Sequence, residues 1–294
     1  MSYPLIFGEV LFDQFEDGNS VLGGAPFNVA WHLTGLGLQP RMLTRIGTDA
    51  NASAVQAAMH DWRMSDELVQ LDPDKATGTV QVKMQQGQHR FEIVQDVAYD
   101  YIAPPATATL ARLGAPALLY HGSLVARNST SRATLRHLRE SLHCPVFVDI
   151  NLRAPWWDAQ TVDMLIDGAT WLKINDEELH TLVTTGNDLQ GKAKQLLAQK
   201  QLAAVIVTRG AQGAFVQTRD ALISCEPVRV ARLVDTVGAG DAFSAIMIAG
   251  LLKGIDYRTS IELAAEFAAR ICEQRGATVH DRRFYEYYIE RLAV

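Results

Sequence analysis

The chain has few cysteines and no long apolar run. Three cysteines occur in 294 residues, at the distant positions 144, 225 and 272, without a C-x-x-C pair or a histidine at metal-ligand spacing. This pattern argues against a zinc module and favours a reduced, cytoplasmic location without structural disulfides. The longest apolar runs, such as 242–252, fall short of the roughly 20 residues of a membrane span, and the amino terminus lacks a basic signal region. We therefore expect no membrane partner.

An excess of positive charge is also missing. The chain carries 27 Lys and Arg against 33 Asp and Glu, a net charge of −6. Nucleic-acid binding depends on clustered basic side chains that displace counterions from phosphates, so we expect no nucleic-acid partner. Internal repeats, low-complexity tracts and hinge-like linkers are absent as well, which predicts a single domain over residues 1–294.

Short apolar segments rich in β-formers alternate with helical patterns along most of the chain. This alternation is typical of βαβ units and predicts an α/β fold with a doubly wound, mainly parallel sheet flanked by helices. The expected strands are 5–10, 42–46, 117–121, 146–150, 171–174 and 205–208, and the expected helices are 26–36, 50–62, 241–253, 257–274 and 282–292.

One segment interrupts the alternation. The runs 77–84 and 89–94 alternate apolar and polar residues and are joined by Gln85-Gln-Gly-Gln88, which predicts an antiparallel hairpin. A small antiparallel element in such a fold is expected over the carboxyl edge of the sheet, where α/β proteins bind ligands. We interpret 76–102, with part of the region 11–22, as a small β lid, which would allow a homodimer through its edges. The alternative is a sheet edge without a functional role.

The segment Asp235-Thr-Val-Gly-Ala-Gly-Asp-Ala-Phe243 is the most informative of the chain. A glycine-rich turn that opens a helix directs backbone amides and the positive end of the helix dipole at one small volume, which suits a phosphate. Asp241 lies in the first turn of that helix. A carboxylate beside bound phosphate is well placed to take a proton from a hydroxyl that attacks phosphorus.

Two other phosphate-binding signatures fail. The segment Gly186–Lys192 matches G-x-x-x-x-G-K, but Ala193 occupies the place of the Mg²⁺-binding Ser or Thr, and the residues before it are typical of a helix. Two dinucleotide-like patterns have Pro40 and Phe243 where the third glycine belongs. A P-loop and a Rossmann nicotinamide site are therefore not expected.

A second glycine motif, Gly23-Gly24-Ala-Pro-Phe-Asn28, precedes an expected helix. Paired glycines let the backbone approach a ligand closely, and Asn28 offers both a donor and an acceptor to hydroxyl groups. Taken alone, the motif is equally typical of a tight turn followed by a helix cap.

Together, these motifs resemble the ribokinase-like (PfkB-type) carbohydrate kinases over essentially the whole chain. The two signatures are Gly-Gly-x-Pro-x-Asn at 23–28 and Gly-Ala-Gly-Asp at 238–241, and the accompanying segments are 8–13, 45–49, 149–153, 175–178 and 208–213. The resemblance implies a ribokinase-like fold with a small β lid, and a kinase that uses ATP and Mg²⁺ to phosphorylate a small-molecule sugar.

The resemblance also implies roles for the reacting groups. Asp241 would be the general base for the sugar hydroxyl, and the backbone amides of Gly238, Ala239 and Gly240 would form the anion hole. The positions that match sugar-binding residues of the family are Asp13, expected on the first strand, with Gly23, Gly24 and Asn28. Arg153 lies in a segment that resembles the Asp-x-Asn-x-Arg region of fructokinases and 2-keto-3-deoxygluconate kinases, and it would either neutralise phosphate charge or anchor a loop.

Further matches concern the nucleotide and the cations. Asn175 and Glu178 match the N-x-x-E motif of the Mg²⁺–phosphate region, where Glu178 would act through water, although the same spacing forms a helix capping box. The positions that match the nucleotide site are Thr208, Gly210, Gly213 and Gly276. Asp235 and the carbonyl of Val237 match a monovalent-cation site, which makes K⁺ a further expected cofactor, but the proline common after the Gly-Ala at 276–277 is missing.

The favoured substrate is a ketohexose, D-fructose phosphorylated at O6, because Asp13 would repel an acid-bearing substrate. Ribose, 2-keto-3-deoxygluconate and a nucleoside remain alternatives within the kinases, although no residue marks the apolar pocket that a nucleoside base requires. A non-catalytic sugar or nucleotide sensor is the alternative from another class. The presence of Asp241 and of all three anion-hole positions argues against it.

Overall fold

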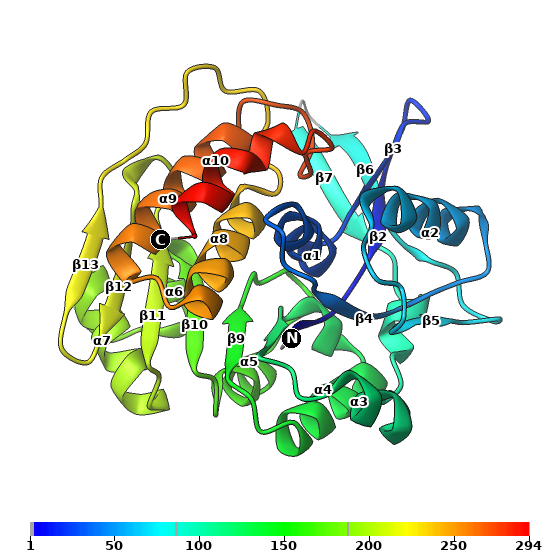
Figure 1. Cartoon of the computed structure of the whole chain (residues 1–294), viewed down its shortest axis with the longest axis horizontal. Coiled ribbons are helices and arrows are strands. Elements are labelled where there is room, and N and C mark those ends of the chain that lie inside the picture. The colour runs from blue at the N-terminus through cyan, green and yellow to red at the C-terminus, as the bar shows by residue number, and fades with distance from the viewer. Residues whose placement is uncertain (1–2, 86–87, 187, 294) are drawn as a thin grey trace.

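A nine-stranded sheet runs through the centre of the structure, a computed structural model that describes residues 3–85, 88–186 and 188–293 (Figure 1). Its strands, in spatial order, are β13 (Leu222–Cys225), β12 (Ala214–Thr218), β11 (Ala204–Thr208), β10 (Trp171–Asn175), β9 (Val146–Asp149), β8 (Leu118–His121), β1 (Pro4–Phe7), β4 (Arg41–Ile46) and β5 (Val69–Leu71). All pairs from β11 to β5 are parallel, whereas β12 and β13 extend the sheet antiparallel. The predicted α/β class with a mainly parallel sheet is therefore confirmed.

Helices cover both faces of this sheet, because alternate strand residues point into two separate hydrophobic cores. One core is closed by α1 (Ala25–Gly35), α2 (Ala50–Trp62), α8 (Ala239–Lys253), α9 (Tyr257–Ile271) and α10 (Arg283–Arg291). The other is closed by α4 (Ser129–Ser141), α5 (Ala159–Ile166), α6 (Asp176–Leu182) and α7 (Leu189–Lys200), and α3 (Thr107–Leu113) lies nearby without a buried residue. In the described part of the chain, no helix is both long and apolar enough to cross a bilayer.

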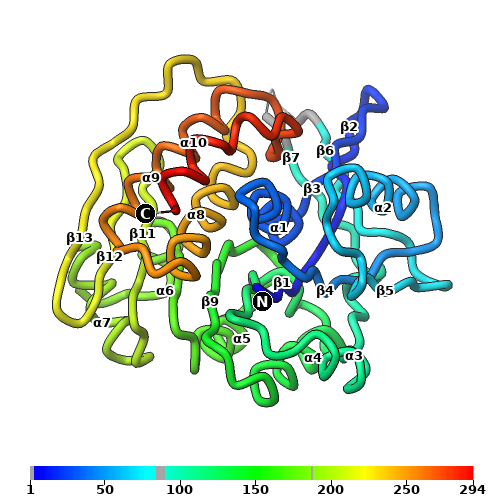
Figure 2. Tube along the Cα trace, in the orientation of Figure 1, coloured from blue at the N-terminus to red at the C-terminus, as the bar shows by residue number. Residues whose placement is uncertain are grey.

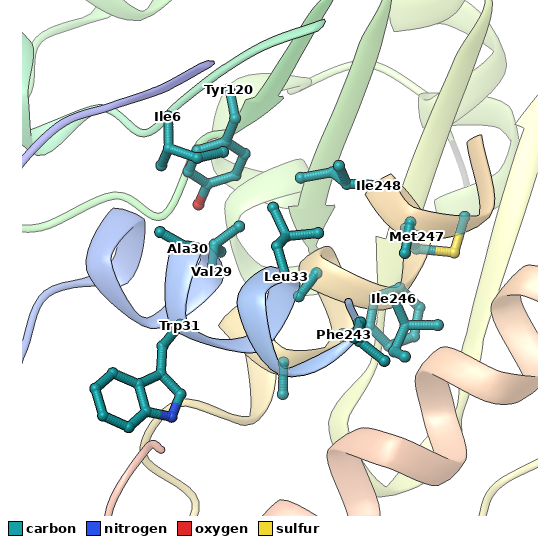
Figure 3. Packing of buried hydrophobic residues seen from close by; sticks show 14 of the residues in the cluster. Ile6, Val29, Ala30, Trp31, Leu33, Tyr120, Phe243, Ile246, Met247 and Ile248 are labelled. Carbon is teal, nitrogen blue, oxygen red and sulfur yellow. The ribbon is translucent and has the colours of Figure 1, made fainter. Parts of the chain in front are cut away.

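The packing of α1 against α8 matters most for the site. Both helices are mainly apolar and are buried over most of their length, as expected of helices covered on several sides. Figure 3 shows their side chains meeting beneath the sheet, with Val29 and Leu33 from α1, Phe243 and Ile246 from α8, and Ile6 and Tyr120 from the strands. This contact brings the first turns of two helices, distant in the sequence, to one place.

A second, four-stranded sheet stands beside the first, in the order β3 (Ser20–Gly23), β2 (Leu11–Phe15), β6 (Gly78–Gln85) and β7 (Gln88–Ile93). The pairing of β6 with β7 is antiparallel, as predicted, and the N-terminal strands β2 and β3 lie beside them (Figure 2). The predicted turn Gln85–Gln88 includes residues 86 and 87, which lie outside the described residues.

The expected first strand, 5–10, is present but shorter, and the expected place of Asp13 on it was wrong. The strand β1 ends at Phe7, and Asp13 lies on β2 of the small sheet. The chain leaves the main sheet at Gly8, where it passes so close to α1 that a Cβ on Gly8 would lie 2.3 Å from Cγ of Pro26. The small sheet therefore contributes Asp13 to the site instead of the main sheet.

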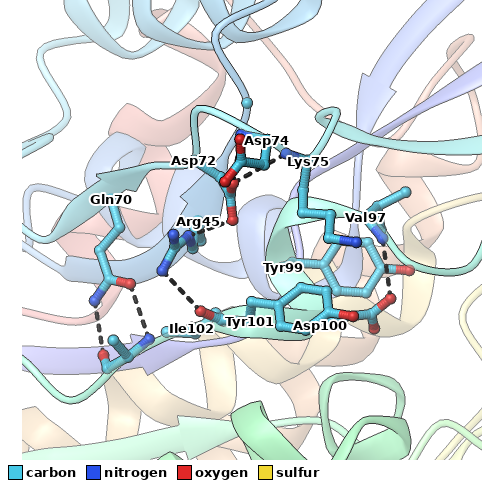
Figure 4. A network of polar contacts seen from close by, with 12 residues as sticks. Arg45, Gln70, Asp72, Asp74, Lys75, Val97, Tyr99, Asp100, Tyr101 and Ile102 are labelled. Carbon is cyan, nitrogen blue, oxygen red and sulfur yellow. Dashed lines mark hydrogen bonds and ion pairs between the residues drawn. The ribbon is translucent and has the colours of Figure 1, made fainter.

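A polar network anchors the return from β7 to the main sheet (Figure 4). Nε of Arg45 lies 2.8 Å from Oδ2 of Asp72, and the Arg45 guanidinium also donates to the carbonyl of Tyr101. Gln70 exchanges two hydrogen bonds with the backbone of Ala103. The base of the small sheet is thus fixed through η1 (Ala98–Tyr101), next to the strands that carry the site.

Candidate active site

The turn at Gly238 opens α8 with a backbone that only glycine adopts readily. Gly238 is the N-cap of the helix with a φ of 79°, and a Cβ there would lie 2.3 Å from Cβ of Ala277. Within the described part of the chain, no side chain caps the first amides of α8. The amide of Ala239 makes one long bond, 3.3 Å, to the carbonyl of Thr236. The turn can therefore offer amides and the positive end of the helix dipole to an anion.

Asp241 is buried in the first turn of α8 and bound to the second glycine motif. Nδ2 of Asn28, in the first turns of α1, donates a 2.8 Å hydrogen bond to Oδ2 of Asp241 across 213 residues of sequence. Burial raises the pKa of Asp241 to about 6, while the bond from Asn28 opposes this rise and the charge of Asp149 adds to it. Asp241 is therefore mostly ionised at neutral pH and can accept a proton.

The two motifs meet because both helices begin at the carboxyl edge of the sheet. Gly24 precedes α1 with a φ of 106°, and a Cβ there would lie 2.8 Å from the carbonyl oxygen of Glu9, just beyond the end of β1. Gly23 is buried beside it, and a Cβ on Gly23 would lie 3.9 Å from Oδ1 of Asn28. Oδ1 of Asn28 is itself buried without a hydrogen-bond partner in the described chain, so it is available to a ligand.

Asp13 and Arg153 belong to the same electrostatic neighbourhood. Asp13 is half-buried on β2, and burial raises its pKa against the lowering effect of Arg153, with Asp235 adding to the rise. The exposed Arg153 also lowers the pKa of Asp241. The structure thus brings a cation from the loop after β9 together with carboxylates from β2 and α8.

Sequence reasoning missed Glu9, which follows β1 directly. Its side chain is 4% exposed, and Oε2 has no hydrogen-bond partner among the described residues. Burial raises its pKa to about 7; Asp241 reinforces the rise and Arg127 and Arg153 oppose it. The only signal in the sequence was a charged residue directly after an apolar strand.

Glu9→Gln is expected to stabilise the protein above pH 7 and to change little near pH 4. The folded pKa of Glu9, about 7, exceeds the ordinary 4.5, so its contribution to stability is complete below pH 4.5 and is lost as the pH rises to about 7. The loss is about 3 kcal/mol at 1.36 kcal/mol per unit of pKa. Urea denaturation at pH 4.5 and pH 8 measures it. The exposed Glu140→Gln is the control, and an equal gain at both pH values would contradict the prediction.

Asn175 and Glu178 form the predicted capping box at the start of α6. Oδ1 of Asn175 accepts from the amide of Glu178 at 2.8 Å, and Oε2 of Glu178 accepts from the amide of Asn175 at 3.0 Å. Oε1 of Glu178 accepts from the amide of Leu152 at 2.7 Å. No group of three or more His, Cys, Asp or Glu side chains in the described ranges could hold a metal. Both carboxylate oxygens of Glu178 are thus held in place at the start of α6 by backbone amides.

The other residues assigned to the nucleotide lie along the next strand and its turn. Thr208 ends β11 opposite Asn175 in the sheet register. The turn η3 (Gly210–Gln212) follows. Gly213 has a φ of 81°, and its backbone lies so close to β13 that a Cβ would be 2.7 Å from the carbonyl oxygen of Cys225. Thr208 is thereby adjacent to the capping box, and Gly210 and Gly213 follow it in the next turn.

Asp235 joins the loop before α8 to the segment at Gly276. Its Oδ1 accepts from the amide of Val237 at 3.0 Å, and its Oδ2 accepts from the amide of Gly276 at 3.1 Å. The helix α9 ends at Ile271 instead of the expected residue 274, and the carbonyl of Cys272, next in the chain, accepts from the amides of Val234 and Asp235. These bonds fix the position of the turn that presents the α8 amides.

The sequence 186–192 does not form a P-loop. The helix α6, and not a strand, precedes it, and the segment enters α7, whose N-terminus is capped by the side chain of Asp188 on the amide of Gly191. Residue 187 lies outside the described residues. The rejection of this motif on the missing Ser or Thr is confirmed in its structural context.

Comparison with known proteins identifies relatives that match most of the chain. The model of the pfkB family carbohydrate kinases matches residues 6–282. A fructokinase from Klebsiella pneumoniae is 29% identical over 259 residues, which cover 84% of this chain and 83% of that protein. The structure of a fructokinase from Vibrio cholerae O395 with fructose, ADP and calcium ion has a TM-score of 0.80 at 24% identity, covering 100% of this chain and 99% of that one. A sugar kinase from Pyrococcus horikoshii in complex with ATP has a TM-score of 0.83 at 23% identity, covering 99% and 100%.

The family match spans nearly all of the chain, and the two solved structures share its fold. The bond between Asn28 and Asp241 joins the two motifs on which the resemblance rests. The chain therefore belongs to the pfkB family of carbohydrate kinases and is a phosphotransferase with an alcohol group as acceptor.

Proposed function

We propose that the protein transfers the γ-phosphoryl group of ATP to the primary hydroxyl of a sugar, D-fructose at O6, with fructose 6-phosphate as product. The observation that carries this proposal is the hydrogen bond between Asn28 and Asp241. It puts a sugar-binding type of side chain and an ionised carboxylate at one helix N-terminus suited to phosphate. An acceptor hydroxyl and a phosphoryl group can therefore meet there.

Asp241 takes the proton of the sugar hydroxyl as its oxygen attacks the γ-phosphorus. The new bond joins that oxygen to phosphorus, the bond from phosphorus to the bridging β,γ oxygen breaks, and ADP leaves with the electron pair. The amides of Gly238, Ala239 and Gly240 stabilise the charge on the transferred group, a type of interaction that contributes roughly 3–4 kcal/mol per donor. Mg²⁺ would neutralise phosphate charge during the transfer, and Glu178 would hold it through water.

The acceptor site combines Asp13, Asn28, the backbone at Gly23 and Gly24, and Arg153. The carboxylates of Asp13 and Asp241 disfavour an acidic substrate by charge repulsion. Asp13 can accept two hydroxyl hydrogen bonds, which suits a vicinal diol. The relatives named fructokinase support fructose over ribose, 2-keto-3-deoxygluconate or a nucleoside.

We place the nucleotide along Thr208, Gly210, Gly213 and Gly276, and a K⁺ ion against Asp235 and the carbonyl of Val237. Asp235 already joins the two loops there, and a cation would stiffen the α8 turn further. The small sheet then acts as a lid over the sugar because it carries Asp13. Its exposed Val21 offers an apolar contact for a second copy.

A panel of acceptors with Mg-ATP tests the proposal. ADP release is measured with D-fructose, D-glucose, D-ribose, 2-keto-3-deoxygluconate and nucleosides, and ³¹P and ¹³C NMR identify the phosphorylated carbon. We expect the highest kcat/KM with fructose and phosphate at O6. A higher value with another acceptor reassigns the substrate, and binding without turnover of every acceptor would favour a sensor.

Asp13→Ala is expected to raise the KM for the sugar about 10- to 100-fold and the KM for ATP less than twofold. The lost hydrogen bonds to a charged group are worth about 1.5–3 kcal/mol, which corresponds to this range. Steady-state kinetics with each substrate varied in turn measure both constants. Asp17→Ala, in the exposed turn of the same β2–β3 hairpin, is the control. An equal effect on both KM values would remove Asp13 from the sugar site.

A further inference from the structure

Lys173 is a buried cation in the strand β10, which is otherwise largely apolar. Its side chain is 9% exposed, and Nζ lies 3.0 Å from both carboxylate oxygens of Asp149 on the neighbouring strand β9. Oγ of Ser244, on α8, donates a 2.7 Å hydrogen bond to Oδ2 of the same Asp149. A buried ion pair is thus attached to the helix that carries the phosphoryl-binding turn.

The pair has a defined direction along α8. A Cβ built on Gly240 would lie 3.1 Å from Nζ of Lys173, so the ammonium group abuts the first turn of the helix. Ser244 follows Gly240 by four residues, about one helical turn, and binds the carboxylate of Asp149. The positive end of the pair therefore faces the helix N-terminus, and its field adds to that of the helix dipole.

Stability alone is a weak reason for such a pair. Desolvation of two charges offsets most of their attraction, and apolar residues of similar volume often stabilise as well or better. The negative groups near Lys173 include Glu178 and Asp241, both in the region assigned to phosphoryl transfer. The location of the ammonium group therefore indicates a role in the reaction.

We propose that Lys173 is a positioning residue for phosphoryl transfer: its ammonium group, held by Asp149, keeps the first turn of α8 electropositive and so stabilises the charge of the transferred group. The proposal rests on the function proposed above for this turn and for Asp241. Lys173 acts through the first turn of α8, because its Nζ lies beside Gly240. Neither Lys173 nor its role follows from the motifs singled out in the sequence.

The charges around Asp241 supply a readout that a purely structural role would not move. The groups that face Asp241 are Asn28 from α1, Asp149 from β9, Arg153 from the loop after β9, Lys173 from β10, Tyr120 from β8 and Glu9 beyond β1. Lys173 lowers the pKa of Asp241, whereas Asp149 raises it. Removal of the Lys173 charge should therefore raise the pKa of Asp241, and removal of the Asp149 charge should lower it.

The experiment compares Lys173→Met, Asp149→Asn and the double variant with the wild type. We expect Lys173→Met to lower kcat at its pH plateau about 10- to 100-fold, less than the roughly 10²–10³-fold for a donor that touches the transition state. In the pH profile of kcat, the midpoint of the acidic limb should move to higher pH by roughly one unit in Lys173→Met and to lower pH in Asp149→Asn. Lys173→Arg keeps the charge and should restore most of the rate.

A second buried lysine provides the matched control. Lys192 on α7 is 6% exposed and donates to the carbonyl of Val183, away from the site, so Lys192→Met should leave kcat unchanged. If Lys173→Met does not fold, the double variant carries the test, because it buries no unpaired charge. We expect the double variant to fold and to keep the low kcat. A kcat within twofold of the wild type in the double variant or in Lys173→Met overturns the proposal.

The proposal and the proposed function fail in different ways. A wild type that phosphorylates fructose, with variants that match it, overturns only the role of Lys173. A wild type without turnover on any acceptor overturns the proposed function, and the pKa of Asp241 is then titrated by ¹³C NMR without substrate. A higher pKa of Asp241 in Lys173→Met and a lower one in Asp149→Asn still support the electropositive turn. An unchanged pKa in both variants overturns it.

Discussion

Asp241→Asn is expected to lower kcat about 10³-fold while the Kd values for ATP and sugar stay within about twofold. A positioned general base contributes roughly 10²–10⁴ in rate, and the amide that replaces the carboxylate cannot take the proton. Its oxygen can still accept from Nδ2 of Asn28, so the contact between α1 and α8 survives. Steady-state kinetics and calorimetric titration of both ligands measure the two effects separately.

The pH dependence gives this prediction a second readout. The pKa of Asp241 is about 6, so the kcat of the wild type should fall tenfold per pH unit below that value as the base becomes protonated. The variant should lose this acidic limb. Asp61→Asn, exposed on α2, is the control for the substitution itself. Near-normal turnover in Asp241→Asn would show that another group accepts the proton.

Regular elements with a clear local signal were predicted closely. The helix α2 has the expected bounds, because its apolar spacing is bracketed by Asp49, whose side chain accepts from the amide of Ala52, and by Arg63 in the left-handed region. The pairing of β6 with β7 was likewise visible as two alternating runs. Local patterns predict elements well when caps and alternation agree.

Elements that depend on distant contacts were missed. Part of the region 11–22 was expected in the lid, but the place of β2 between β3 and β6 was not predicted, because β6, which pairs with it in parallel, follows more than 60 residues later. The antiparallel strands β12 and β13 close the far edge of the main sheet, where the βαβ pattern predicts nothing. Strand pairing of this kind depends on tertiary contacts more than on intrinsic propensity.

In the candidate site, too, residues with a local sequence signal were predicted, and residues that depend on distant contacts were missed. The glycine motifs and Asp241 were visible because their backbone needs are local, as the positive φ of Gly238 confirms. Lys173 and Glu9 were missed because their burial depends on α8 and α1 packing over the ends of β10 and β1. In the sequence, a single lysine in an apolar strand is equally typical of a side chain that reaches solvent.

Gly238→Ala is expected to lower kcat about 10²–10³-fold and to destabilise the fold by more than about 1 kcal/mol. The φ of 79° is strained for alanine, and the added Cβ would lie 2.3 Å from Cβ and 2.6 Å from Cα of Ala277. Because Ala277 belongs to the backbone that Asp235 and Gly276 tie to the same loop, the turn must move instead. Displaced amides no longer match the phosphoryl group, and one lost donor of this kind costs roughly 10²–10³ in kcat.

Gly254→Ala separates the backbone effect from the effect on the site. Gly254 ends the same helix with a φ of 72°, and a Cβ there would meet nothing within 4 Å. It should therefore lower stability by about 1 kcal/mol, as expected for alanine at a positive φ, and leave kcat unchanged. Thermal denaturation and steady-state kinetics on both variants give the comparison. Equal losses of kcat in the two variants would mean that the turn at Gly238 affects the rate only through the stability of α8. A loss of kcat confined to Gly238→Ala would show that the rate depends on how this turn presents the first amides of α8.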